Sequence, residues 1–125
     1  MHTKASDGAN SIAQMAEAAL ARGYEYIAIT DHSQALRITN GLSPERLLQH
    51  IRQIDAVNSK LRGFRILKSA EVDILEDGKL DYENSLLKDL DLTICSIHSR
   101  FGLNKQQQTG RILRAMDNRY FSILG

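Results

Sequence analysis

The chain has 125 residues, enough for one ordinary domain, and its formal net charge of +1 gives no strong field for nucleic acid or membranes. A single cysteine, Cys95, excludes an intrachain disulfide framework, and no apolar run approaches the roughly 18 residues of a membrane span. The first residues carry no apolar signal segment, so we expect a cytoplasmic location.

The first third of the chain predicts a helix followed by a strand. Ser11 and Gln14 form a capping-box pattern, which predicts the start of a helix, and Gly23 is a residue type that commonly ends one. Residues 25–30 are a short, mostly apolar run, which is typical of a buried parallel strand. A polar loop, residues 31–42, follows this strand.

The clearest predicted helix begins after this loop. Ser43 is a preferred cap residue and Pro44 fits the first helical position, while Gly63 is expected to close the helix. Its apolar residues recur at helical spacing: Leu47, Leu48, Ile51, Ile54 and Leu61. His50 lies at the edge of this apolar stripe, and we expect it to be solvated.

The second half continues the alternation of strands and helices. The helix predicted after Asn104 ends near Met116, with Ile112, Leu113 and Met116 on its apolar side. The other predicted elements, in order, are a strand at 64–74, a tight turn at 76–78, a return strand at 79–82, a short helix at 85–90, and strands at 92–97 and 120–124.

This alternation predicts an α/β fold with mostly parallel strands. No linker composition divides the chain, so residues 1–125 are expected to form a single domain. The chain opens in polar loop residues and stops directly after a strand. We therefore expect it to be part of a longer α/β barrel or sheet.

Polar side chains follow three predicted strands. His32 follows the first strand, Glu71 and Asp73 stand near the end of the second, and His98 follows the third. In α/β folds such strand ends carry the chemistry, so we expect one shared polar site. Neutral imidazole together with carboxylate suits Zn, Mn or Fe.

The candidate metal ligands come from four segments of the chain: His2, Asp7, His32, Glu71 and His98. No two of them share the spacing of a zinc finger, so spacing alone leaves a structural role open for each. Arg37 and Arg100 lie in loops beside His32 and His98, where each could bind a phosphate or be a solvated surface residue. No serine stands in a nucleophile-elbow pattern.

The segments around these candidates resemble the motifs of the PHP family, the polymerase and histidinol phosphatase superfamily. The motifs are His2-Thr3 with Ser6-Asp7-Gly8, Ile29-Thr30-Asp31-His32-Ser33, Glu71-Val72-Asp73-Ile74 and Ser96-Ile97-His98-Ser99. The sequence between these motifs is similar to that of the C-terminal PHP domain of bacterial family X DNA polymerases. The resemblance covers essentially the whole chain.

The resemblance implies a partial, distorted (β/α)7 barrel that holds up to three divalent ions, Zn, Mn or Fe, at its strand ends. It implies a metal-dependent phosphoesterase of the 3′–5′ exonuclease and phosphatase type, with DNA 3′ ends as one substrate class. A small-molecule phosphatase of the histidinol-phosphatase type is an alternative. The implied ligands are His2, Asp7, His32, Glu71 and His98; of these His32, Glu71 and His98 are the catalytic centre, and Glu71 bridges two ions.

Other ligands of the family pattern have no counterpart in this sequence. The opening His-x-His has only its second histidine, His2, and a histidine expected after Gly125 falls beyond the last residue. A second hypothesis is therefore a catalytically incomplete structural or interaction fragment. Such a fragment could form a homodimer in which each copy completes the barrel of the other.

Overall fold

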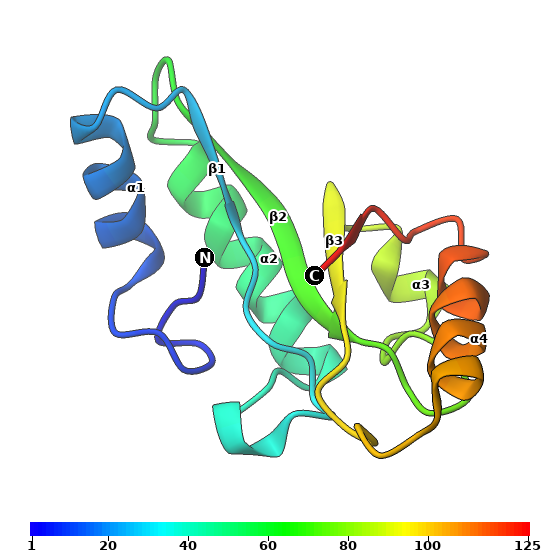
Figure 1. Ribbon diagram of the computed structural model, residues 1–125. Helices are drawn as coiled ribbons and strands as arrows, with labels where there is room; N and C mark the ends of the chain where they lie inside the picture. Colours follow the sequence, from blue (N-terminus) through cyan, green and yellow to red (C-terminus); the bar gives the residue numbers. More distant parts are fainter.

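The computed structural model describes residues 1–125, and a four-stranded parallel sheet forms its centre (Figure 1). The strands are β1 (Tyr26–Ile29), β2 (Arg65–Asp73), β3 (Leu92–Ser96) and β4 (Ile123–Leu124), and they lie side by side in that order. All three neighbouring pairs are parallel. The sheet is open, with β1 and β4 at its edges, as expected for part of a PHP-type barrel.

Helices connect the parallel strands, as predicted from the alternating pattern. These connecting helices are α2 (Pro44–Asn58), α3 (Asn84–Leu87) and α4 (Lys105–Met116), and a further helix, α1 (Ile12–Ala21), precedes β1. In Figure 1, α2 lies behind β1 and β2, whereas α3 and α4 lie on the β3 side of the molecule. None of these helices combines the length and the apolar character needed to cross a lipid bilayer.

The predicted helix starts are confirmed by their caps. The Ser11 hydroxyl accepts a hydrogen bond from the Gln14 N–H, which completes a capping box, and Asn104 begins α4 in the same manner. The Ser43 hydroxyl caps α2 ahead of Pro44. The end of α2 was predicted too late: the helix stops at Asn58, because that side chain instead bonds to the backbone of β2.

The hydrophobic core lies between the sheet and the helices. One cluster joins α1, α2, β1 and β2, and it includes Ile29, Ile54 and Ile66, each 0% exposed. A second cluster joins α2, α3, α4, β2 and β3 and includes Val72. Because side chains alternate along a strand, Glu71, next to Val72, points to the opposite face of β2.

The return strand predicted at residues 79–82 is wrong. Only an isolated antiparallel bridge between Ile74 and Leu80 forms there. The turn itself is present, with Gly78 at φ +87°. After the turn, the Tyr82 hydroxyl donates to the carbonyl of Leu42 at 2.6 Å, so burial of this ring against the core directs the chain away from a longer hairpin.

The predicted apolar side of α4 is also wrong. Leu113 and Met116 are 57% and 52% exposed, whereas Arg111 and Ala115 are fully buried. Arg111 Nε donates to the carbonyl of Leu75 at 2.8 Å, Nη1 donates to that of Ser99 at 2.9 Å, and Nη2 donates to that of Ile74. These acceptors orient the helix, so Arg111 joins α4 to the segments that follow β2 and β3.

Replacing Arg111 by leucine is expected to lower the free energy of unfolding by about 3 kcal/mol, because buried carbonyls lose their donors. Urea denaturation of the purified variant measures this change. Arg114→Leu is the matched control on the same helix: Arg114 is exposed and makes one hydrogen bond, to the Asp77 carbonyl. A loss in Arg111→Leu no larger than in the control would contradict this role.

Candidate metal centre

The ends of three parallel strands bring the predicted site together. His32, which follows β1, forms a parallel bridge with Glu71 of β2, so the two residues are lateral neighbours. His98 follows β3 by two residues, beside the end of β2. The amino-terminal turn, residues 2–8, adds His2 and Asp7 from the other side. All five predicted ligands therefore belong to one cluster.

Glu71 is the centre of this cluster. Its Oε1 lies 3.0 Å from His98 Nε2 and 3.8 Å from His32 Nδ1, while its Oε2 lies 3.3 Å from His2 Nε2. Asp7 also contacts the rings of His2 and His32. Its Oδ1 lies 3.5 Å from His2 Nδ1, and its Oδ2 lies 3.6 Å from His32 Nε2. The rings of His2 and His32 stack with centroids 4.4 Å apart.

The donor set fits a divalent cation. One ligand atom from each of His2, His32 and Glu71 lies within 4.8 Å of the others. His2 Nδ1 and His32 Nδ1 are buried without a hydrogen-bond partner. Buried polar atoms are nearly always paired, and a cation held between these nitrogens and the neighbouring carboxylates would pair them. The Asp7 side chain is 42% exposed, so the cluster is open to solvent beside Asp7.

The electrostatics of the cluster also favour metal binding. Burial lowers the pKa of His32 below its ordinary value, and the neighbouring rings of His2 and His98 act in the same direction, although Glu71 and Asp7 oppose them. A lowered pKa favours neutral imidazole. That is the form that ligates a metal.

Asp73 holds His98 in place, a role that the sequence did not reveal. The carboxylate of Asp73 contacts His98 Nδ1, and this leaves His98 Nε2 facing Glu71. Asp73 itself is fixed, because it is 5% exposed and its N–H donates to the Ser33 hydroxyl at 2.9 Å. A carboxylate on the far nitrogen of a ligating histidine fixes its tautomer and ring orientation. The available signal was the Glu-x-Asp spacing, which puts both side chains on one face of a strand.

The prediction that His50 is solvated is wrong. His50 is 2% exposed, and its Nε2 lies 2.9 Å from Oδ2 of Asp31. The signal was present in the helical spacing, because position 50 is three residues after Leu47 and four before Ile54, on the buried side of α2. Burial raises the pKa of Asp31, but the contact with His50 and hydrogen bonds from Ser6 and Thr3 outweigh it and hold this pKa well below its ordinary value.

The two arginines proposed for phosphate binding do not join the cluster. Arg37 begins a short 3-10 helix and is exposed. Arg100 Nε lies 2.9 Å from Oε2 of Glu76, and this pair is solvent-exposed. Both arginines lie in loops that follow strands of the sheet, as predicted, but neither makes an ion pair with a cluster residue.

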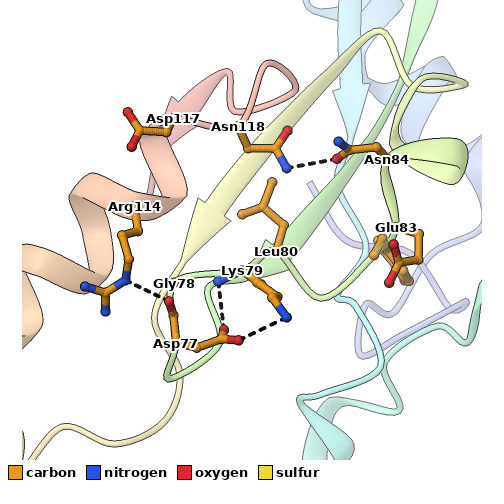
Figure 2. A pocket seen from close by; sticks show the side chains of 10 residues that line it. Asp77, Gly78, Lys79, Leu80, Glu83, Asn84, Arg114, Asp117 and Asn118 are labelled. Carbon is orange, nitrogen blue, oxygen red and sulfur yellow. Dashed lines mark hydrogen bonds and ion pairs between the residues drawn. The ribbon is translucent and has the colours of Figure 1, made fainter.

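A wide pocket of about 550 Å³ lies elsewhere, beside α4 and the turn after β2. Figure 2 shows that its polar groups pair with one another: Arg114 Nε donates to the Asp77 carbonyl, and Asn118 Nδ2 donates to Oδ1 of Asn84 at 2.9 Å. None of the five cluster residues lines it. The pocket is therefore separate from the metal centre.

Parallel strands that end in a histidine–carboxylate cluster define an α/β domain with its site at the strand ends. Comparison with known protein families shows which family of α/β domains this is. The sequence model of the PHP domain matches residues 1–124, and the chain belongs to the PHP domain family. The resemblance drawn from the four motifs is thereby confirmed.

Several curated proteins are similar to this chain. It is 48% identical over 124 residues to the DNA polymerase/3'-5' exonuclease PolX of Bacillus subtilis, covering 99% of this chain and 22% of that protein. It is 30% identical over 129 residues to a probable phosphatase of Caldanaerobacter subterraneus subsp. tengcongensis, which covers 99% of this chain and 48% of that protein. A probable phosphatase of Acetivibrio thermocellus is 37% identical over 99 residues, which covers 78% of this chain and 39% of that protein. The chain thus spans half of these relatives or less.

Asp73→Asn is expected to weaken binding of Zn or Mn by roughly tenfold to a hundredfold, because the amide no longer holds His98 by a charged contact. Isothermal titration of the metal-free protein measures this affinity. Asp89→Asn, at an exposed carboxylate outside the cluster, is the control and should leave the affinity unchanged. Equal affinities in the two variants would refute the orienting role of Asp73.

Proposed function

We propose that this PHP domain is a divalent-metal-dependent phosphoesterase, with His32, Glu71 and His98 as its catalytic centre. The observation that carries this proposal is the position of Glu71 among three imidazoles that come from separate chain segments. The similar proteins support it, since their names describe a 3'-5' exonuclease and probable phosphatases. No serine or cysteine nucleophile is needed for such hydrolysis.

The residues that would hold metal are His2, Asp7, His32, Glu71 and His98. The two oxygens of Glu71 face different imidazoles, Oε2 facing His2 and Oε1 facing His32 and His98, so Glu71 would be the carboxylate shared between the ions, as the family resemblance implies. Zn, Mn or Fe, up to three ions in the complete family site, would polarise the phosphoryl group and lower the pKa of a water. Asp73 keeps Nε2 of His98 directed at this centre.

The proposed substrates are phosphoesters, and DNA 3′ ends are the first class to test because of the similarity to PolX. A small phosphomonoester of the histidinol-phosphate type is the alternative. In both cases Arg37 and Arg100 are proposed to bind the substrate phosphate, for which Arg100 must separate from Glu76. Parallel assays with a 3′-labelled oligonucleotide and with p-nitrophenyl phosphate distinguish the two classes.

His32→Ala is expected to lower Mn-dependent hydrolysis of these substrates by about a hundredfold or more, because a buried ligand at the centre of the cluster is lost. Elemental analysis of the same preparations reports how much metal each retains. Asp89→Asn is again the control. Unchanged activity in His32→Ala would refute the assigned role, and a native chain that binds no ion even in excess would refute the metal centre.

A second proposal is that this chain acts as a structural or interaction module that pairs with another copy. Apolar side chains are exposed at both sheet edges: Tyr26 of β1 is 63% exposed, and Ile123 and Leu124 of β4 are 48% and 50% exposed. Strand edges of this kind are templates for further pairing.

Light scattering is expected to give the mass of a dimer if a second copy covers these edges. Leu124→Lys would then shift the protein to a monomer, because a charge on β4 opposes burial of that edge. Ile38→Lys, at a residue that is 92% exposed outside the sheet, is the control. A native chain that is monomeric at all concentrations would refute the pairing.

A further inference from the structure

We infer that Asp31, held by His50, is a positioning residue that fixes the amino-terminal ligands His2 and Asp7 against His32. The inference rests on the proposed metal centre and adds a residue that acts on it without binding metal. It starts from an observation that the sequence did not predict, a buried carboxylate–imidazole contact between the end of β1 and helix α2.

The hydrogen bonds of Asp31 go to the segment between the two amino-terminal ligands. Oδ1 accepts from the Thr3 N–H at 2.7 Å and from the Ser6 hydroxyl at 2.5 Å, and Oδ2 accepts from the Thr3 hydroxyl at 2.8 Å. Thr3 directly follows His2, and Ser6 directly precedes Asp7. One carboxylate therefore fixes the backbone on both sides of the turn.

Polar contacts hold the amino-terminal segment in place, and besides those of Asp31 they include the Met1 carbonyl, which accepts from the Thr30 N–H at 2.8 Å. Among residues 1–10, Thr3 and Ser6 alone are buried, and they are the two residues that donate to Asp31. This segment thus contributes no fully buried apolar side chain to the core. Its position depends on polar contacts, which are directional and so define the geometry of the ligands beside them.

Helix α2 supports this arrangement at two points. His50 contacts Oδ2 of Asp31 at 2.9 Å, and Arg46, one turn earlier, donates through Nη2 to the carbonyl of Ala5 at 2.5 Å. Both contacts converge on the turn between His2 and Asp7. A buried carboxylate is costly unless it is fully paired, and the partners of Asp31 are His50 and the two residues beside the amino-terminal ligands, Thr3 and Ser6.

The anchoring is tested first without metal. In the chelated protein, amide hydrogen exchange at Thr3 and Ser6 is expected to be slow in the native chain and at least about tenfold faster in Asp31→Asn. Asn58→Ala is the matched control: it removes two hydrogen bonds between α2 and β2 at the other end of α2. Unchanged protection at Thr3 in Asp31→Asn would overturn the anchoring.

The effect on the metal centre is tested with Co²⁺, whose absorption spectrum reports the number and geometry of its ligands. Asp31→Asn is expected to weaken Co²⁺ binding by roughly tenfold and to change the spectrum, whereas Asn58→Ala should do neither. In a double-mutant cycle, His2→Ala should weaken binding in the native background and have little further effect in Asp31→Asn. Additive effects would overturn the proposal.

Ser6→Ala provides a milder variant in case Asp31→Asn does not fold. It removes one hydroxyl donor to Asp31 and no ligand, and a smaller loss of Co²⁺ affinity, about threefold, is expected. Unchanged affinity and spectrum in Ser6→Ala would count against the proposal. If the native chain binds no Co²⁺, the proposed function fails and with it the metal role of Asp31, while the exchange experiment still decides the anchoring.

Discussion

The parallel pairing of β2 with both of its neighbours is the constraint on which the site depends. Parallel strands end at the same edge of a sheet, so the residues that follow β1 and β3 meet the end of β2. The bridge between His32 and Glu71 is the direct result of this register. An antiparallel partner would carry its strand end to the opposite edge. Helix α2 provides the long crossover between β1 and β2 that parallel pairing requires.

Buried charges fix the surroundings of the cluster in a common manner. Asp31, Asp73 and Arg111 are each 5% exposed or less, and each bonds to a segment that leads into or out of a ligand. Replacing both partners of a buried pair by apolar residues often leaves stability unchanged, but apolar residues supply no direction. The polar groups instead specify where a backbone segment or a ring must lie. Stability of this domain is thus coupled to the geometry of its site.

Much of the fold could be predicted from the sequence, because strand periodicity and helix caps are local signals, and strand-end residues with the family motifs predicted which five side chains meet in the cluster; their role as metal ligands stays a prediction. The contacts of His50, Asp73 and Arg111 could not, because their partners Asp31, His98 and Leu75 are distant in the sequence and meet them only when the elements pack. The return strand predicted after Gly78 does not form for the same reason, since burial of Tyr82 against the core overrides the local strand pattern, although the turn itself is present. The single domain and the cytoplasmic location stay predictions.

The five residues of the proposed metal centre differ in how the fold holds them. Glu71 stands within β2, and His32 and His98 directly follow strands, so the sheet itself sets their positions. His2 and Asp7 belong to a turn whose buried contacts are polar and converge on one carboxylate. The exposed fractions of the two carboxylates differ accordingly: the Glu71 side chain on the sheet is 17% exposed, whereas the Asp7 side chain in the turn is 42% exposed. The sheet therefore sets the positions of three of the five residues directly, whereas His2 and Asp7 depend on the side-chain contacts of Asp31 for theirs.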